Sequence, residues 1–323
     1  MKVRSLGKTG IKVSEIGYGA WGIGGEMWQG SDDAIAMKSL RKAVELGVNF
    51  FDTALAYGNG HSEQLVGQLR KRGNETMYVA TKIPPKNRQW PARAGVPFHE
   101  VFPKDYIINS TNQSLTNLGM ESLDLQQLHV WSDEWVGVDE IWEAVRLLKS
   151  QGKIKAFGIS INDHAPASAL KAAKTGMVDT FQVIYNIFDQ SPEEELFPYC
   201  QANDIGVIVR VPFDEGGLTG RVKPDTVFPE RDWRNGYFRG DRKQQVYDRV
   251  EKLKTFLGPD AKTLPELALR FILTNTAVST VIPGMRTLAN VEMNAAVSDG
   301  KRLPERITKE LKKHKWLRNF YGE

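Results

Sequence analysis

Short runs of apolar residues alternate along the chain with longer runs in which apolar side chains recur every three or four positions. The short runs are rich in β-branched and aromatic residues, which is typical of buried strands, and the longer runs are typical of amphipathic helices. Two helices are predicted with clear ends, at residues 33–46 before Gly47 and at residues 139–150 before Gly152. Strands are predicted at residues 15–18, 49–52, 77–81, 123–130, 156–159, 180–183, 206–211 and 280–283.

This alternation predicts parallel pairing of the strands, either in an open sheet or in a closed barrel. Eight strand–helix units in 323 residues favour the barrel, whose typical size is about 250 residues. No linker rich in Pro, Gly or Ser divides the chain. We therefore predict an α/β protein in which residues 1–323 form a single (β/α)8 TIM-barrel domain with extra helices. Residues 3–13 are predicted to form an N-terminal β-hairpin across the barrel bottom, because two short alternating runs flank a Gly-containing turn.

Two long segments fit no strand–helix unit. Residues 84–103 are rich in Pro and contain Trp90, so we expect no regular structure there, and residues 216–241 are rich in Gly, Arg and aromatic residues. Loops of this length in compact domains are usually functional lids or binding loops. Both segments follow strands, and a barrel carries such loops on its catalytic face.

The composition narrows the class of partner. The chain is 41% hydrophobic and 25% charged with a net charge of +4, and its basic residues are scattered among acids rather than clustered as nucleic-acid binding requires. Neither a membrane-spanning apolar run nor a secretory signal is visible, so the expected location is the cytoplasm. Cys200 is the only cysteine, which excludes an intrachain disulfide and cysteine-based metal spacings. We expect Cys200 in the core and expect no metal site.

Gly17, Gly19 and Gly22 match the GxGxxG pattern of dinucleotide-binding folds. That pattern binds a pyrophosphate only where a helix begins at the glycines, and here the next predicted helix begins near Asp33. The acid expected about 20 residues further on at a strand end is also missing, since Glu45 lies within a predicted helix. We interpret these glycines instead as a corner between a strand and a loop, where a ligand can approach the backbone.

Four ionisable residues fall at the ends of predicted strands or just beyond them, namely Asp52, Tyr57, Lys82 and His129. The C-terminal ends of barrel strands form the one face on which reactive groups from distant segments converge. Each residue alone has an ordinary structural explanation, such as packing for Tyr57 or a hydrogen-bonded core position for His129. Four of them at equivalent positions favour a catalytic site.

The motifs around these residues resemble those of the aldo-keto reductase family. The matching motifs are, in chain order, FDTA at 51–54, YGNG at 57–60, Ser62-Glu63, Thr81-Lys82, Leu128-His129, GIS at 158–160, Gln182, GGLTG at 216–220 and IPG at 282–284. The resemblance extends over roughly residues 3–294, in the order that the family has. It implies a bacterial-type, NADPH-dependent aldo/keto reductase, similar to the general-stress-protein-like members.

The chemistry of carbonyl reduction assigns a role to each of the four residues. A hydride must reach the carbon and a proton the oxygen, and the proton donor must be a weak acid. Tyr57 is the candidate donor, because a Lys82 ammonium beside it would stabilise the phenolate; lowering its pKa by roughly two units corresponds to about 2.7 kcal/mol. Asp52 is expected to hold Lys82 through a charge-assisted hydrogen bond. His129 is expected to donate to the substrate oxygen as negative charge develops there.

The resemblance implies that NADPH supplies the hydride and lies extended across the barrel mouth. Ser160, Asn162 and Gln182 are then expected to bind the nicotinamide carboxamide, and Asp52 the neighbouring ribose. The family more often has Asn directly after this serine, whereas Ile161 stands here. Residues 218–221 are expected over the pyrophosphate and residues 284–294 at the adenosine end. Further residues assigned to the cofactor in this way are Trp21, Arg210, Pro212, Leu218, Gly220, Arg221, Gly284, Arg286, Asn290 and Asn294.

Two positions depart from the family pattern. Arg210 stands where many members have a tyrosine that stacks on the nicotinamide. Its planar guanidinium either stacks there, favouring reduced over oxidised cofactor, or forms a salt bridge to Asp214 or Glu215. Many relatives have an arginine where Asn290 stands, so Arg286 is the candidate ligand of the 2′-phosphate, the alternative being an ordinary exposed arginine that opens the next helix.

Trp21, Trp90 and Trp131 are predicted on loops of the same face. Together with Tyr57 and His129 they form the predicted substrate site, where aromatic walls suit an apolar or sugar-like carbonyl compound. Packing is the alternative role for each tryptophan. The sequence identifies neither the substrate itself nor the oligomeric state.

Three functions stay open at this point. The first is NADPH-dependent reduction of aldehydes and ketones, with a small-molecule carbonyl compound as the partner. The second is oxidation of a sugar or polyol, because hydride transfer is reversible. The third is a cofactor-sensing regulatory subunit on the same fold, like the potassium-channel β subunits, which keep the cofactor groove. The complete set of four residues favours an enzyme.

Overall fold

Eight parallel strands form the centre of the computed structural model, which describes residues 1–25, 30, 32–71, 73 and 77–317. They are β3 (Tyr18–Gly19), β4 (Phe50–Asp52), β5 (Tyr78–Ile83), β6 (Leu123–Leu128), β7 (Ile154–Ser160), β8 (Thr180–Ile184), β9 (Gly206–Arg210) and β10 (Thr280–Val281). They pair in chain order from β3 to β10. The ring closes because the Gly17 amide donates to the Val281 carbonyl at 2.8 Å and the Val281 amide to the Glu15 carbonyl at 3.0 Å. The predicted (β/α)8 barrel is confirmed.

The glycines near residue 20 serve this closure. A Cβ atom on Gly19 would lie 2.6 Å from the Ile282 carbonyl oxygen, so only glycine lets the first and last strands approach this closely. A 3-10 turn, η2 (Trp21–Ile23), follows β3, and the first helix, α1, begins only at Asp33. No α-helix therefore begins at these glycines, which agrees with their interpretation as a corner between a strand and a loop.

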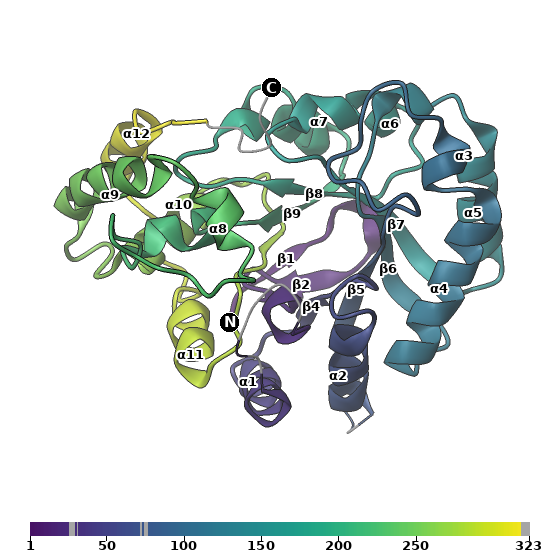
Figure 1. Cartoon of the computed structure of the whole chain (residues 1–323), viewed down its shortest axis with the longest axis horizontal. Coiled ribbons are helices and arrows are strands. Elements are labelled where there is room, and N and C mark those ends of the chain that lie inside the picture. The colour runs from purple at the N-terminus through teal and green to yellow at the C-terminus, as the bar shows by residue number, and fades with distance from the viewer. Residues whose placement is uncertain (26–29, 31, 72, 74–76, 318–323) are drawn as a thin grey trace.

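Helices surround the strands on every side (Figure 1). The main ones are α1 (Asp33–Glu45), α2 (His61–Arg70), α4 (Lys104–Leu118), α5 (Asp139–Ser150), α6 (Leu170–Lys174), α7 (Leu196–Ala202), α9 (Arg242–Leu253), α10 (Leu264–Thr274), α11 (Leu288–Ala296) and α12 (Glu305–Lys312). Their apolar faces and the outer faces of the strands form one large core, which includes Cys200 as predicted. Within the described ranges, no helix is long and apolar enough to cross a membrane.

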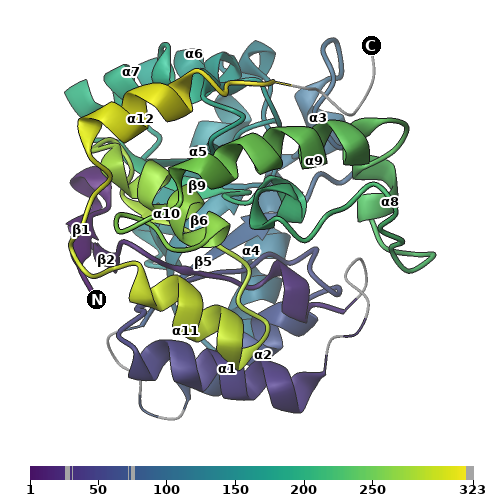
Figure 2. The same cartoon turned by 90° about the vertical axis from the view of Figure 1, so that its left-hand side faces the viewer.

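A hairpin of β1 (Val3–Ser5) and β2 (Lys12–Ser14) lies across the bottom of the barrel, as predicted. It completes a second core inside the barrel, formed by Leu6, Ile11, Val13, Phe50, Ala80, Leu125, Ala156, Ile208 and Ile282. Its turn packs directly on β9. The two backbones are so close that a Cβ atom on Gly7 would lie 2.3 Å from the Gly206 nitrogen. Figure 2 places the hairpin and the short helix α8 (Arg234–Tyr237) at opposite ends of the barrel.

The two inserted segments contain short helical elements. The expectation of no regular structure in residues 84–103 is wrong at α3 (Phe98–Val101), which forms because Phe98 and Val101 are both buried and the Phe98 ring packs on Trp135 at 5.9 Å. Residues 216–241 include the end of the 3-10 segment η6 (Asp214–Thr219) and α8. In Figure 2, α3 and α8 lie toward the same end of the barrel, opposite the hairpin.

Candidate active site

Lys82 and Asp52 form a buried ion pair at the C-terminal ends of β5 and β4. The Lys82 side chain is fully buried, and its Nζ donates to both carboxylate oxygens of Asp52, at 2.9 Å for Oδ1, and to the Thr53 carbonyl at 2.9 Å. Gln182, on β8, donates to Asp52 Oδ1 at 2.6 Å. Burial alone lowers the pKa of Lys82, but attraction to Asp52 outweighs burial and raises it. Lys82 is therefore an ammonium at neutral pH, with acceptors for its protons.

The Tyr57 hydroxyl lies 3.4 Å from Lys82 Nζ. Glycines fix the turn that carries Tyr57: Gly58 has a φ of 63°, and a Cβ atom there would lie 2.0 Å from the Gly24 carbonyl oxygen. Burial raises the pKa of Tyr57, and the nearby ammonium of Lys82 opposes this rise only in part. The predicted proximity of phenol and amine is confirmed. The predicted net lowering of the pKa of Tyr57 is wrong, because burial outweighs the charge.

His129 lies edge-on to Tyr57, with 5.7 Å between the ring centroids. Its Nδ1 atom is buried and has no hydrogen-bond partner among the residues that the structure describes. Burial, and then the positive charges of Lys82 and Arg210, hold the pKa of His129 well below its ordinary value. The ring is therefore neutral and carries one N–H that can donate to a ligand oxygen.

Three indole rings lie around this pair. Trp21 lies 6.2 Å from the Tyr57 ring, and Trp90 lies edge-on to His129 at 5.8 Å. Trp233, from the segment at residues 216–241, packs on Trp21 with 5.9 Å between the ring centroids. The structure thus brings the predicted residues Trp21 and Trp90 beside the four candidate catalytic residues.

A second group of predicted residues lies along the ends of β7 to β10. Ser160 and Gln182 are buried and pair in register between β7 and β8, next to Asp52. Leu218 is buried in η6, and Gly220 ends η6 with a left-handed φ of 73°. On α11, Asn294 is 1% exposed, and its side-chain oxygen and nitrogen have no partner in the described part of the chain. Such an amide is exceptional, because buried polar side-chain atoms are normally hydrogen-bonded.

A model of the aldo/keto reductase family matches residues 15–315. The chain belongs to this family. It is 32% identical to the NADH-specific methylglyoxal reductase of Escherichia coli, over 92% of this chain and 93% of that protein. A holo form of an aldo-keto reductase from Bacillus halodurans has a TM-score of 0.78 at 28% identity and covers 100% of both chains. A glycerol dehydrogenase from Gluconobacter oxydans has a TM-score of 0.80 at 26% identity and covers 97% of this chain and 94% of that chain.

Membership makes this chain part of a family of oxidoreductases that use nicotinamide cofactors. One predicted substrate residue of this aldo/keto reductase nevertheless lies elsewhere. Trp131 is fully buried, packs on Trp135 and Trp142, and donates from Nε1 to Asp133 at 2.8 Å. Trp131 was predicted on a loop of the catalytic face because it directly follows a predicted strand, but the chain bends at residues 129–130, directly after β6, and the Trp131 side chain lies in the core. The substrate role of Trp131 is wrong.

Asn162 has a different partner from the one that the family pattern implies. Its Oδ1 accepts from the Ala92 amide at 3.2 Å, and its Nδ2 donates to the Ala92 carbonyl at 3.3 Å. Ile161 occupies a buried position directly after β7 and moves Asn162 one residue further along the loop. The amide therefore holds the segment at residues 84–103, and binding a carboxamide would require these bonds to break.

Arg210 forms a salt bridge, but not to either predicted partner. Its guanidinium donates to two groups of the loop after β7, to Asp163 Oδ1 at 2.5 Å and to the Ile161 carbonyl at 2.8 Å. Asp214 instead accepts from the Tyr237 hydroxyl and from Arg242 at 3.0 Å. The predicted pairing of Arg210 with Asp214 or Glu215 is wrong.

The adenosine-end residues lie around the start of α11. Arg286 is partly buried, and Arg234 and Asp232 are charged groups close enough to influence its pKa, which burial lowers. The backbone N–H of Asn290 donates to the side-chain hydroxyl of Thr287, the N-cap of α11, at 3.3 Å. The remaining predicted residues are Pro212, buried after β9, Arg221, exposed after η6, and Gly284, exposed after β10.

Two supporting features were missed. Glu63 is buried and accepts from Thr81 at 2.5 Å and from Asn117 at 2.7 Å, which ties α2 to β5 and α4 behind the site. Its place in the Ser62-Glu63 motif was the available signal. Trp233 could be found only as one aromatic residue of a long loop.

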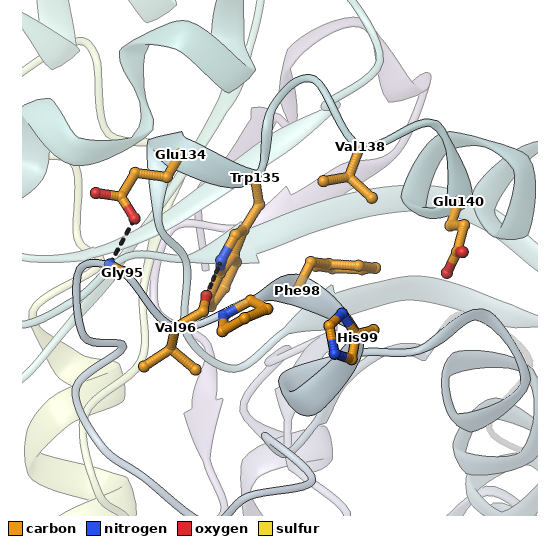
Figure 3. A pocket seen from close by; sticks show the side chains of 9 residues that line it. Gly95, Val96, Phe98, His99, Glu134, Trp135, Val138 and Glu140 are labelled. Atoms are coloured by element: carbon orange, nitrogen blue, oxygen red, sulfur yellow. Dashed lines mark hydrogen bonds between the residues drawn. The ribbon is translucent and has the colours of Figure 1, made fainter.

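The segment at residues 84–103 is fastened to the loop before α5. Figure 3 shows the Trp135 indole donating to the Val96 carbonyl, at 2.9 Å, and the Gly95 amide donating to Glu134, at 2.7 Å. A pocket opens between these loops, lined by Gly95, Val96, Pro97, Phe98, His99, Glu134, Trp135, Val138 and Glu140. None of these lining residues belongs to the predicted catalytic site.

Proposed function

We propose that this aldo/keto reductase reduces aldehyde and ketone carbonyls to alcohols with NADPH, and that Tyr57 is the general acid. The observation that supports this most strongly is the convergence of the Tyr57 hydroxyl, the Lys82–Asp52 pair and the neutral His129 ring at one end of the barrel. NADPH supplies the hydride when it is bound.

In this mechanism, the substrate oxygen accepts hydrogen bonds from the Tyr57 hydroxyl and from the His129 N–H. As negative charge develops on that oxygen, Tyr57 gives up its proton. Lys82 stabilises the resulting phenolate by its charge, which matters most once the phenol ionises. Asp52 holds Lys82 in place and keeps it protonated. His129 stays neutral and orients the carbonyl.

The residues proposed to hold the cofactor fit it at two places. Ser160 and Gln182 are adjacent polar groups that suit the carboxamide, while the side-chain amide of Asn294, which has no partner among the described residues, suits the adenine base. Arg286 is proposed to bind the 2′-phosphate of NADPH. The E. coli methylglyoxal reductase is NADH-specific by name, so this part of the proposal needs its own test.

Oxidation of a polyol is the second candidate, favoured by similarity to the glycerol dehydrogenase of Gluconobacter oxydans. The same side chains serve both directions, since Tyr57 as phenolate can accept the proton that it donates in reduction. Assays in both directions at neutral pH separate the two candidates.

The Tyr57→Phe variant tests the mechanism. We expect kcat for NADPH-dependent reduction of small aldehydes and α-dicarbonyls to fall by about 10² to 10⁴-fold, the usual contribution of a positioned general acid. The Kd for NADPH, measured by fluorescence titration, should stay nearly unchanged. Near-normal kcat in the variant would exclude Tyr57 as the acid. Tight NADPH binding without turnover by the wild type would favour the regulatory-subunit alternative.

Cofactor preference tests the role of Arg286. We expect a higher kcat/KM for NADPH than for NADH, and we expect Arg286→Ala to remove most of this difference by raising KM for NADPH alone. Charge-assisted hydrogen bonds contribute about 1.5–3 kcal/mol, which corresponds to a loss of roughly tenfold or more. A wild type that prefers NADH would contradict the phosphate role.

A further inference from the structure

The middle of the segment at residues 84–103 is fastened to the barrel by one side chain, that of Asn162. Its Oδ1 accepts from the Ala92 N–H at 3.2 Å, and its Nδ2 donates to the Ala92 carbonyl at 3.3 Å. Among the residues that the structure describes, no other hydrogen bond joins residues 87–94 to any residue outside this segment. The backbone on either side of this stretch has separate hydrogen bonds, to α4 and to the loop before α5.

The loop that carries Asn162 is fixed on both sides of this residue. The Arg210 guanidinium donates to the Ile161 carbonyl at 2.8 Å and to Asp163 Oδ1 at 2.5 Å. The Ile161 N–H donates to the Gln182 carbonyl at 2.9 Å, which continues the pairing of β7 with β8. The Asn162 amide therefore stands on a loop that cannot move away without breaking these bonds.

Trp90 stands two residues before Ala92, so the bonds of Asn162 restrict where its side chain can lie. Pro91 lies between the two residues, and its ring fixes φ there, which leaves this stretch of backbone little freedom. The Trp90 indole lies edge-on to the His129 imidazole, with 5.8 Å between the ring centroids. Trp90 is nevertheless 40% exposed, so part of the indole is open to a ligand beside His129.

We propose that Asn162 is a positioning residue that fastens Trp90 beside His129, and that Trp90 thereby favours carbonyl substrates that carry an aromatic ring. This proposal rests on the proposed function of the same site. When a carbonyl oxygen accepts from Tyr57 and His129, a ring next to that carbonyl lies within reach of the open part of the indole and can form an aromatic pair with it. Asn162 acts through Trp90 and touches neither the carbonyl nor the proton donor.

A direct role for Asn162 in binding the nicotinamide carboxamide predicts different results. Loss of a carboxamide contact would weaken NADPH binding whatever the substrate. Loss of the bonds to Ala92 would instead weaken only those substrates that contact Trp90. The two roles are therefore separated by the Kd for NADPH and by the ratio of KM for a ring-bearing carbonyl, benzaldehyde, to KM for a compact one, methylglyoxal.

Asn162→Leu removes both bonds to Ala92 and keeps a side chain of similar size. We expect the ratio of KM for benzaldehyde to KM for methylglyoxal to rise by roughly three- to tenfold, the contribution of one aromatic pair. The Kd for NADPH, measured by fluorescence titration, should stay nearly unchanged. Trp90→Leu should raise the same ratio at least as much, whereas Trp90→Phe keeps a ring and should raise it less.

A variant that combines Asn162→Leu with Trp90→Leu shows whether Asn162 acts through Trp90. If it does, the ratio of KM values in the double variant equals that in Trp90→Leu alone, because the ring that Asn162 positions is already gone. An independent structural effect of Asn162 would add to that of Trp90→Leu. Additive effects, a raised Kd for NADPH in Asn162→Leu, or an unchanged ratio of KM values in that variant would each overturn the proposal.

The matched control is Asn49→Leu, because the Asn49 side chain makes the same two kinds of bond at the other end of the barrel. Its Oδ1 accepts from the Ser14 N–H at 2.6 Å, and its Nδ2 donates to the Lys12 carbonyl at 2.9 Å. Asn49→Leu should lower the free energy of unfolding and leave the ratio of KM values unchanged. A rise of this ratio as large as that in Asn162→Leu would mean that it reports only a loss of stability, and the proposal would fall.

Thermal unfolding of each variant shows whether it is folded. If Asn162→Leu fails to fold, Asn162→Ala takes its place with the same expected results, since it also removes both bonds to Ala92.

Limited proteolysis tests the fastening without any turnover. Arg93 is exposed and directly follows Ala92, so trypsin should cut after Arg93 faster in Asn162→Leu than in the wild type or in Asn49→Leu. If the wild type reduces no carbonyl but this cut is faster, the proposed function and the substrate selection are wrong and only the fastening stands. If carbonyls are reduced and neither the faster cut nor the changed ratio of KM values is found, the positioning role is wrong and the proposed function stands.

Discussion

At the scale of single residues, the candidate site combines a buried ion pair, Lys82 with Asp52, and two neutral groups, Tyr57 and His129. Each ion of this pair is the buried partner of the other, so removing one would leave an uncompensated buried charge. Tyr57 and His129 are kept neutral by burial, which raises the pKa of the phenol and lowers that of the imidazole. Both can therefore donate a hydrogen bond to a carbonyl oxygen at neutral pH.

The neutral state of His129 makes a prediction about pH dependence. A histidine whose pKa lies well below its ordinary value of 6.5 does not titrate near neutral pH, so kcat/KM for methylglyoxal should show no ionisation near pH 6.5. His129→Gln keeps an N–H donor and should retain more activity than His129→Leu at every pH. The pH profiles of all three proteins check this. An inflection near pH 6.5 that is present in the wild type and absent from His129→Gln would show that the His129 imidazole titrates near neutral pH in the active enzyme.

At the scale of elements, the strands and their order were predictable, because each strand is a buried apolar run that is flanked by polar residues. The ends were less predictable: β5 runs to Ile83 rather than Thr81, because its ladder with β6 continues to the Ile83–Leu128 pair. The candidate catalytic residues were found because parallel register brings strand ends together. Trp131 was misplaced because a position directly after a strand does not show whether the side chain points to the site or into the core.

Contacts between loops could not be read from the sequence. The partner of Arg210 is Asp163, and Trp233 joins Trp21, although each pair is far apart along the chain. Such pairings depend on how the loops after different strands pack over the barrel. No periodic pattern encodes that packing. The sequence therefore predicted the positions of residues at strand ends better than the contacts of residues on long loops.

The hairpin at the barrel bottom provides a matched pair of glycine substitutions. Gly7→Ala combines a left-handed φ of 51° with a Cβ position 2.3 Å from a backbone nitrogen, so the backbone itself must move. Gly10→Ala has a φ of 77° but no atom within 4 Å of the new methyl group. We expect Gly10→Ala to lower the free energy of unfolding by about 1 kcal/mol, the strain alone, and Gly7→Ala by clearly more. Urea unfolding measures both, and equal losses would mean that the hairpin does not pack tightly on β9.

At the scale of the whole molecule, the two ends of the barrel have different tasks. The candidate site lies at the C-terminal ends of the strands, whereas the other end joins distant parts of the chain through Glu15. This side chain is fully buried, accepts from Arg4 at 3.2 Å, from Arg302 at 2.5 Å and from the Ser298 hydroxyl at 2.9 Å. Arg4 also donates to backbone carbonyls near the C-terminal end of α10, including that of Leu273 at 2.6 Å.

Glu15→Gln tests this division of tasks. It removes the charge that Arg4 and Arg302 share, and breaking a buried ion pair typically costs about 3–5 kcal/mol, so we expect a loss of roughly that size in the free energy of unfolding. The control is Glu45→Gln, whose mostly exposed pair with Lys42 at 3.6 Å should contribute less than about 1 kcal/mol. Under conditions in which Glu15→Gln is folded, its kcat should equal that of the wild type, because no catalytic candidate contacts this end. A fall in kcat without a fall in unfolding free energy would instead mean that Glu15 influences the candidate site through the barrel, and that its task is not confined to holding the ends of the chain together.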